Sequence, residues 1–202
     1  MKQLVEAYKP LAIDGFVGLA KPKAILRRVA DTPYESAWLF LGPSGTGKTT
    51  MALAFADTVG ADVHHIASKA CDLETVNEVV RKCWYQPMFN AWHVVIVDEA
   101  DQMSKPAQLA FLSKLDTTAM PPKTIFVFTA NDTKALEDRF LSRVRTLTFD
   151  HPPVAETALL LHGIWQNEAK GKPGPNYFGI LDDAAGNVRR ALMSLEMDLM
   201  VA

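Results

Sequence analysis

The sequence predicts an α/β fold in which helices flank a parallel sheet, followed by a small all-helical part. Two observations carry this prediction. An apolar run from Trp38 to Leu41 leads through a glycine-rich loop into a helix-forming segment, and a second run, Val94 to Val97, ends in the acids Asp98 and Glu99. Unbroken apolar runs that alternate with amphipathic helical segments are typical of strands buried on both faces of a parallel sheet.

The stretch from Leu4 to Gly18 is predicted to be irregular, because Pro10 and the pair Asp14-Gly15 interrupt regular structure. Lys21 to Ala30 follows as a helix, since proline stands near its start and apolar residues recur at helical spacing. The chain therefore enters its first strand, Trp38 to Leu41, directly after a helix.

The loop after this strand matches the phosphate-binding pattern G-x-x-x-x-G-K-S/T from Gly42 to Thr49. Its glycines let the backbone approach a triphosphate and point several N–H groups at it. Lys48 would place an ammonium group against the β- and γ-phosphates, and the Thr49 hydroxyl would ligate Mg²⁺. The alternative is a chance turn before a lysine, but a strand and a helix flank the loop as the motif requires. The residues expected to bind nucleotide are Gly42, Pro43, Ser44, Gly45, Thr46, Gly47, Lys48, Thr49 and Thr50.

Three elements are predicted after the loop. Thr49 to Val59 has the pattern of an amphipathic helix, and Asp62 to Ile66 that of a short strand. His64 and His65 are adjacent in this strand and would face opposite ways, so they cannot chelate one metal together and are expected to be structural or exposed. Ser68 to Cys83 is predicted to be a helix, because its apolar residues fall on one side.

The strand from Val94 to Asp98 ends in carboxylates. In nucleotide-binding α/β sheets the ligand lies at the carboxyl ends of the strands, so Asp98 is expected to hold Mg²⁺ through its waters. Glu99 is a candidate general base that orients and deprotonates an attacking water. The alternative is that these acids only cap a helix.

Thr124 to Thr129 is predicted to be a further strand, with the polar Asn131 close after its end. A simple turn residue is an equal alternative for Asn131, because Asn-Asp pairs favour turns. Arg145 to Phe149 alternates in polarity and predicts one more strand.

The pair Pro152-Pro153 predicts a domain boundary, with a nucleotide-binding core over residues 1–150 and a helical lid over 151–202. In the lid, Val154 to Ala169 is predicted to be a helix, Gly171 to Asn176 a loop, and the segment entered at Gly186 a last helix to about residue 200.

Composition sets the outer bounds. With 202 residues and 49% hydrophobic content, the chain can form one globular domain with a small appendage. A formal net charge of -2 does not indicate nucleic-acid binding, so any DNA contact must be local. Cys71 and Cys83 lack C-x-x-C spacing, which argues against a zinc ribbon and a disulfide framework. No signal peptide or membrane-spanning run is recognised, so a cytoplasmic protein without membrane contact is expected.

Several short motifs occur along the chain in a defined order: L-V-E-A-Y-K-P from Leu4 to Pro10, F-V-G from Phe16 to Gly18, D-E-A-D from Asp98 to Asp101, A-Q at Ala107-Gln108, T-A-N from Thr129 to Asn131, S-R-V from Ser142 to Val144, and G-N-V-R-R-A-L from Gly186 to Leu192. Together with the glycine-rich loop, they resemble the AAA+ ATPases, and among these the clamp-loader small subunits of the replication factor C type. The resemblance covers nearly the whole chain.

The resemblance implies ATP hydrolysis with ATP and Mg²⁺ as cofactors. It implies that Asn131 acts as the first sensor and Arg189, from the lid, as the second. Arg143 would be an arginine finger that completes the site of a neighbouring subunit, so hydrolysis would need a homo- or hetero-oligomer. Outside the loop, the residues implied to contact nucleotide are Tyr8, Pro10, Phe16, Val17, Val188 and Arg189.

The sequence also departs from the replication factor C pattern. Leu112 and Ser113 stand where the pattern has a pair of arginines. The sequence ends at Ala202, where clamp loaders continue into a helical collar domain. We therefore expect that a partner provides assembly, that the ring forms through AAA+ faces alone, or that the task differs from clamp loading.

DNA contact is predicted at one segment. Ala67-Ser68-Lys69 resembles the family's A-S-D before a helix that follows the duplex backbone, and Ser68, Lys69 and Thr75 are the candidate phosphate ligands. Lysine in place of the family's aspartate favours phosphate, whereas the acids Asp72, Glu74 and Glu78 on the same helix oppose it.

Three functions remain open from sequence. The first is an ATP-hydrolysing protein of clamp-loader type that acts on DNA and a clamp-like or replication partner. The second is a slow, nucleotide-switched adaptor that recruits a replication, repair or transposition partner. The third is a structural subunit that only binds ATP. Glu99 and Arg143 weigh against the third, and the missing collar weighs against the first in its strict form.

Overall fold

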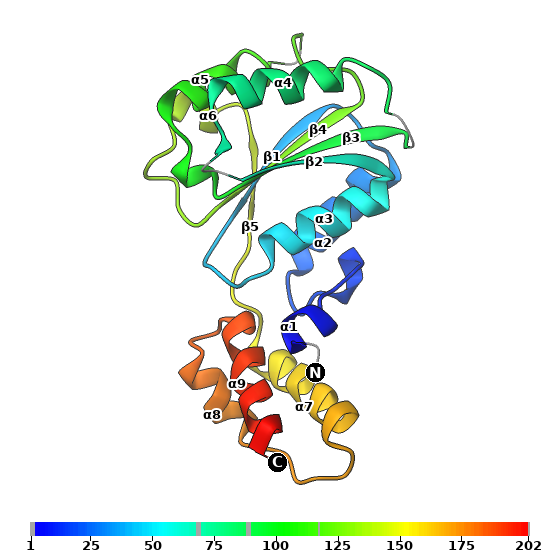
Figure 1. Ribbon diagram of the computed structural model, residues 1–202, viewed down its shortest axis with the longest axis vertical. Helices are drawn as coiled ribbons and strands as arrows, with labels where there is room; N and C mark the ends of the chain where they lie inside the picture. The colour runs from blue at the N-terminus through cyan, green and yellow to red at the C-terminus, as the bar shows by residue number, and fades with distance from the viewer. Residues whose placement is uncertain (1–2, 68–69, 88–89, 117, 202) are drawn as a thin grey trace.

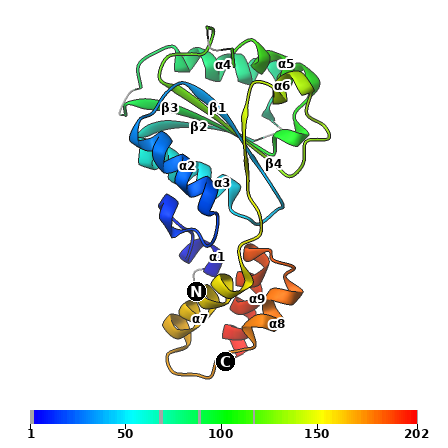
Figure 2. The same cartoon turned by 180° about the vertical axis from the view of Figure 1, so that it is seen from behind.

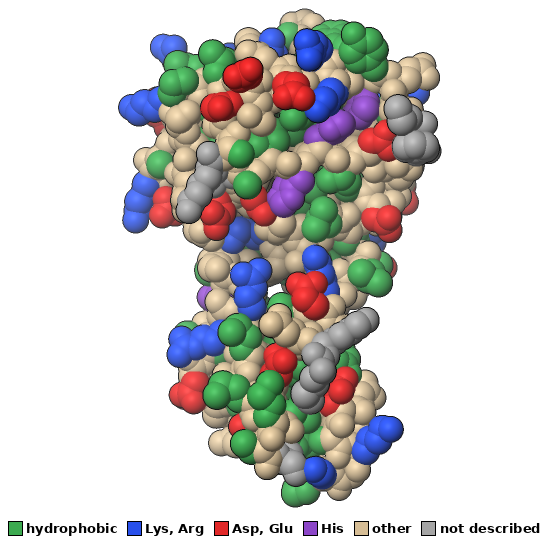
Figure 3. Space-filling model, in the orientation of Figure 1, with side chains coloured by type: hydrophobic (Ala, Val, Ile, Leu, Met, Phe, Trp, Pro, Cys, Tyr) green, Lys and Arg blue, Asp and Glu red, His purple; other side chains and the backbone are tan. Residues whose placement is uncertain are grey.

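The structure is a computed structural model that describes residues 3–201 except for 68–69, 88–89 and 117. Figure 1 shows an α/β part and, below it, a bundle of helices that the last strand leads into. The space-filling view in Figure 3 shows a waist between the two parts. The N-terminal segment lies at this waist, beside both parts (Figures 1 and 2).

The sheet of the α/β part has the order β2-β3-β4-β1-β5 within the described residues, and all of its pairings are parallel. This architecture, with helices on both faces, confirms the predicted fold class. The strands are β1 (Ser36–Leu41), β2 (Ala61–Ala67), β3 (Trp92–Asp98), β4 (Thr124–Ala130) and β5 (Arg145–Thr148).

The register brings the chemically important strand ends to one edge. Leu41 of β1 lies opposite Ala130 of β4, and Val97 of β3 lies opposite Phe128, which is also in β4. Because β4 lies between β1 and β3, the segments that follow these three strands begin beside one another. The nucleotide loop and the D-E-A-D motif therefore meet at the carboxyl edge of the sheet.

Helices cover both faces of the sheet (Figures 1 and 2). One face carries α2 (Ala20–Asp31) and α3 (Lys48–Val59), and the other carries α4 (Leu73–Cys83), α5 (Lys105–Leu112) and α6 (Asp138–Leu141). Strand residues alternate between two buried clusters. Val94 and Ile96 pack with α3, whereas Val95 and Val97 pack with α4 and α5.

The lid consists of α7 (Val154–Ala169), α8 (Tyr177–Asp183) and α9 (Val188–Val201), which enclose a separate apolar cluster. The short helix α1 (Leu4–Ala7) packs on this lid, since Leu4 is 2% exposed and belongs to the lid cluster. Ile13, in the 3₁₀ turn η1 (Ile13–Gly15), packs instead with the sheet. The first residues thus connect the two parts. None of the helices in the described ranges is both long and apolar enough to cross a bilayer.

Most predicted elements agree with the structure to within a few residues, and α7 has the predicted bounds. The prediction that residues 4–18 are irregular was wrong at α1 and η1, two elements too short for a periodic pattern to reveal. The helix predicted from residue 68 begins at Leu73, because the Asp72 carboxylate caps it by accepting from the Thr75 backbone N–H at 2.8 Å. The lid contains one helix, α8, that was not predicted; Asn176 caps it just after the glycine- and proline-rich loop.

Candidate functional site

The loop between β1 and α3 has a conformation that requires glycine at two positions. Gly47 has φ +88°, and a Cβ there would lie 3.1 Å from the Phe16 ring. Gly45 has φ +80°, and a Cβ there would overlap the Asn187 side chain of the lid. A side chain at either position would combine backbone strain with a close contact. The loop is therefore shaped to touch the N-terminal segment and the lid.

Lys48 opens α3 and lies inside the loop, only 9% exposed. Its Nζ donates to the carbonyl oxygens of Gly42 at 2.6 Å and Pro43 at 2.8 Å, and to Oδ1 of Asn131 at 3.1 Å. The structure thus brings together Lys48 and the candidate first sensor at the end of β4. These contacts hold the ammonium at the mouth of the loop.

Burial lowers the pKa of Lys48, and the nearby carboxylates of Asp101 and Asp98 oppose this shift. Arg189 of the lid adds to the lowering, because its positive charge lies close enough to repel the ammonium. The charges thus converge on the loop from both parts of the molecule. A bound phosphate would oppose this lowering of the pKa, because a nearby anion favours the charged form of the lysine.

Asp98, at the end of β3, is the centre of a polar network. Its Oδ1 accepts hydrogen bonds from the hydroxyls of Thr49 at 2.6 Å and Thr129 at 2.8 Å, and Nε2 of His65 lies 3.2 Å from its Oδ2. The hydroxyl of Thr49 and the carboxylate of Asp98 are hard oxygen donors, which are the ligands that Mg²⁺ takes in proteins. The donor set at this point fits the predicted metal site.

Glu99 follows directly and has an unusual backbone conformation, with φ +50°. Its N–H donates to the Thr129 hydroxyl at 3.0 Å, and its side chain is exposed. A non-glycine residue with positive φ costs free energy and persists where the surroundings impose it, which is common at functional sites. Glu99 therefore stands on a fixed backbone with a side chain free to meet a water.

Sequence reasoning did not assign a role to Thr129. This residue is 2% exposed, and its single hydroxyl both donates to Asp98 and accepts from the Glu99 backbone. A threonine at the carboxyl end of a predicted strand was the available signal, but its contact with Asp98 follows only from the pairing of β4 with β3. His65 was also missed, because its contact with Asp98 depends on how β2 pairs with β3.

A pocket runs from the loop to the N-terminal segment and the lid. Its walls include every nucleotide-contacting residue implied outside the loop, namely Tyr8, Pro10, Phe16, Val17, Val188 and Arg189. They also include three leucines, Leu53, Leu160 and Leu192, to which sequence reasoning assigned no contact with nucleotide. An apolar cleft beside a phosphate-binding loop suits a flat base.

The lid reaches the loop directly through Asn187. Its Nδ2 donates to the carbonyl oxygen of Ser44 at 3.1 Å, and its Oδ1 accepts from the backbone N–H of Arg190 at 3.0 Å. One side chain therefore caps α9 and ties it to the phosphate loop. Because Arg189 stands in the first turn of α9, this contact also fixes the backbone that carries the candidate second sensor.

Arg143 lies away from these residues. Its Nε donates to Oδ1 of Asp116 at 2.8 Å, and one of its terminal nitrogens donates to the Arg139 carbonyl at 2.9 Å. It precedes the amino end of β5, whereas the loop follows the carboxyl end of the neighbouring β1. Since β5 and β1 are parallel neighbours, Arg143 lies at the amino ends of the strands and the loop at their carboxyl ends. The structure does not bring Arg143 to the site of its own chain.

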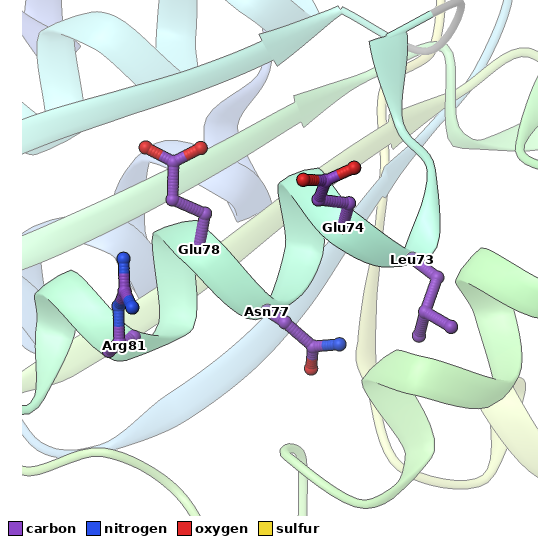
Figure 4. A pocket seen from close by; sticks show the side chains of 5 residues that line it. All are labelled: Leu73, Glu74, Asn77, Glu78 and Arg81. Atoms are coloured by element: carbon purple, nitrogen blue, oxygen red, sulfur yellow. The ribbon is translucent and has the colours of Figure 1, made fainter.

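The predicted DNA-binding residues are only partly placed, because Ser68 and Lys69 lie outside the described residues. Thr75 lies in the first turn of α4, where its backbone N–H is bonded to Asp72. Figure 4 shows a groove along α4 with Glu74 and Glu78 projecting from the same stretch of helix as Arg81. The groove is lined by Leu73, Glu74, Asn77, Glu78 and Arg81. Carboxylates along this surface weaken, rather than strengthen, attraction for a phosphate backbone.

Residues 38–150 match the family described as "ATPase family associated with various cellular activities (AAA)". The chain belongs to this family. The matched segment begins within β1 and ends after β5, so it includes the phosphate loop, Asp98, Glu99 and Asn131.

The AAA chain is similar to replication factor C small subunit 2 of Pyrobaculum aerophilum, with 30% identity over 95% of this chain and 62% of the relative. It is also similar to replication-associated recombination protein A of Coxiella burnetii, with 27% identity over 96% of this chain and 46% of the relative. The first of these relatives confirms the resemblance to replication factor C small subunits. The chain spans less than two thirds of the length of either relative.

Among solved structures, the RuvB Holliday junction branch migration motor of Thermotoga maritima has a TM-score of 0.76 and 16% identity, covering 94% of this chain and 64% of that one. At this identity the likeness shows the fold alone. It supports the same succession of parallel sheet and helical lid.

Proposed function

We propose that this AAA protein binds and hydrolyses ATP in an assembly in which a neighbouring subunit completes each active site, and that it acts on DNA or on a replication partner. The observation that carries the proposal is the network around Asp98, which joins the phosphate loop through Thr49 to Glu99 through Thr129. This network links the residues that would bind the triphosphate to the residue that would activate water.

Each residue has a physical role in this proposal. Lys48, held at the loop by the Gly42 and Pro43 carbonyls, and the loop amides at the N-terminus of α3 bind the phosphates. Thr49 and Asp98 would hold Mg²⁺, which when bound neutralises charge on the phosphate oxygens. Glu99 accepts a proton from the attacking water, and Asn131, held by Lys48, orients it. The core and the lid, divided near residue 150, would both contact the nucleotide, and Arg189 would provide the contact from the lid.

The proposal that the site is shared rests on the position of Arg143. Trp38 pairs with Arg145 and Leu41 with Thr148, so the phosphate loop begins roughly 10 Å beyond Arg145 along the strands. Arg143 lies before Arg145, on the far side from the loop, with a half-exposed ion pair to Asp116. A guanidinium at the amino ends of the strands is better placed to reach the nucleotide of a second subunit than the nucleotide of its own chain.

A mixing experiment tests this shared site. Arg143→Ala should bind ATP normally but hydrolyse it on the order of 10³-fold more slowly, the scale of other arginine fingers. Lys48→Ala should not bind ATP but keeps Arg143, which can complete the intact site of an Arg143→Ala neighbour. Mixing the two variants should therefore restore part of the activity. No recovery in mixed assemblies verified by mass would refute the shared site.

The link to DNA or replication rests on relatives named for replication, and here the adaptor remains a second candidate. The carboxylates beside Arg81 in the α4 groove favour the adaptor, since they oppose a phosphate backbone (Figure 4). Ser68, Lys69 and Thr75 remain the proposed DNA contacts. ATPase rates with and without duplex DNA, together with the mass in solution with and without ATP, separate the two. If DNA stimulates the ATPase rate and Lys69→Glu abolishes this stimulation, the clamp-loader type of function is supported. Slow ATP turnover that does not change with DNA supports the adaptor.

A further inference from the structure

A second cluster of polar side chains lies away from the nucleotide pocket, where β2, β3 and the end of α4 meet. It consists of His64 on β2, His93 on β3 and Cys83, the last residue of α4. One ligand atom from each lies within 4.8 Å of the other two. The strands lie beneath α4 in Figure 1, and histidine side chains reach the surface of the α/β part in Figure 3.

We propose that His64, Cys83 and His93 bind a borderline-soft divalent ion such as Zn²⁺, with a solvent molecule as fourth ligand. Two imidazole nitrogens and one thiolate form a common donor set for such an ion. Bond lengths of about 2.0–2.3 Å in a tetrahedral site place neighbouring ligand atoms roughly 3–4 Å apart. Nε2 of His64 and Nδ1 of His93 are already 3.0 Å apart. The sulfur of Cys83 lies within 4.8 Å of both nitrogens.

The tautomer of His93 supports the proposal. Its Nε2 donates to the carbonyl oxygen of Tyr85 at 2.9 Å, which leaves Nδ1 with a lone pair directed to the cluster. An imidazole that ligates a metal commonly donates its other N–H to a backbone carbonyl in this way, which fixes the ring. His93 is 4% exposed, so the surrounding structure defines its orientation.

Exposure is graded across the cluster. Cys83 is fully buried and His93 nearly so, whereas His64 is only partly buried on the edge strand β2. The ion can therefore enter at His64, where water can occupy the fourth position. Bound there, it would tie the edge strand and the end of α4 to β3. The cluster is thus a candidate for stabilising the face that carries the α4 groove.

The protonation states are compatible with binding. Burial and the nearby imidazole of His93 lower the pKa of His64, with Lys82 acting in the same direction and Asp62 against it. This shift favours the neutral imidazole, which is the form that ligates a metal. Burial raises the pKa of the Cys83 thiol to about 11, only partly offset by Thr124, so the thiol holds its proton until a cation displaces it. Binding then releases one proton from sulfur, and affinity rises with pH.

The test uses the full chain after treatment with a chelator. Titration of Zn²⁺ by calorimetry, in buffers of different ionisation enthalpy, should give one site per chain and one proton released. Co²⁺ should produce a thiolate charge-transfer band, which separates this cluster from oxygen ligands near Asp98. Cys83→Ala should abolish that band and weaken Zn²⁺ binding by at least about 100-fold.

Cys71→Ala is the matched control, because Cys71 is also buried, has a thiol pKa raised to about 11, and lies outside the cluster. It should keep the band and the affinity. His64→Asn, at the partly exposed edge, gives an independent variant should Cys83→Ala fail to fold, and it should weaken binding similarly. Absence of saturable binding in the parent chain, or equal affinity in parent and His64→Asn chains, would overturn the proposal and leave a hydrogen-bonded histidine pair.

Discussion

The Thr129→Val substitution tests the proposed site most directly, because valine keeps the shape of threonine and removes only its hydroxyl. That hydroxyl is buried, donates to Asp98 at 2.8 Å and accepts from the Glu99 N–H at 3.0 Å. The substitution leaves the phosphate loop unchanged. It therefore separates the positioning of the acids from the binding of phosphate.

The expected loss of stability follows from these two hydrogen bonds. Asp98 keeps its contacts with Thr49 and His65, so the main cost is the unpaired N–H of Glu99. A partly buried donor left without a partner costs about 1–2 kcal/mol. For a domain of this size, that corresponds to a decrease in Tm of roughly 2–8 °C.

The expected effect on turnover is larger than the effect on binding. Without the hydroxyl, neither Asp98 nor the strained backbone at Glu99 is anchored to β4. A shift of about 1 Å in a catalytic group lowers the rate on the order of 100-fold. We expect kcat to decrease by between 10- and 100-fold, while the Kd for ATP, measured by calorimetry, changes little.

Thr129→Ser provides the control, because serine retains the hydroxyl while losing a methyl group. It should restore most of the turnover even if Tm stays below that of the parent chain. If Thr129→Val lowers Tm but hydrolyses ATP at the parental rate, the network does not position Glu99 for catalysis. The role of Glu99 as base would then need another explanation.

Three further substitutions test the rest of the site. Lys48→Ala should abolish or strongly weaken ATP binding in calorimetry, because the loop loses its phosphate-facing cation; unchanged affinity would refute the cradle. Glu99→Gln should retain ATP binding but slow hydrolysis about 100-fold or more in a phosphate-release assay, and parental turnover would make Glu99 a structural residue. Asn187→Ala should lose both the cap of α9 and the bond to Ser44, lowering stability by about 0.5–2 kcal/mol and weakening ATP binding. Asn187→Asp keeps the capping oxygen without the donor, so normal ATP affinity in Asn187→Asp would show that the Ser44 contact is dispensable.

The sheet and the phosphate loop could be predicted from sequence because their signals are local. The run from Val94 to Val97 must be buried on both faces, and the pattern ending at Lys48-Thr49 has one well-defined use. Periodicity also predicted that His64 and His65 face opposite ways, and the two side chains do contact different groups. His64 contacts His93, and His65 contacts Asp98.

What sequence could not supply was the pairing between distant segments. The diagonal contact of His64 with His93 depends on the register of β2 and β3, in which His64 lies opposite Val95. The bridging role of Thr129 depends on β4 lying beside β3. Leu4 was placed with the core by its position in the chain, yet it packs with the lid. Residue spacing along a chain does not encode such contacts.

The arrangement of cations around the phosphate loop argues for an assembly rather than an isolated active chain. Lys48 approaches the loop from α3, and Arg189 lines the pocket from the lid. Glu99 is exposed where it follows the carboxyl end of β3. The charge that builds up on the transferred phosphoryl group needs a cation there as well. In the proposed assembly, Arg143 would supply this cation to a neighbouring subunit, so nucleotide turnover would depend on contact between subunits.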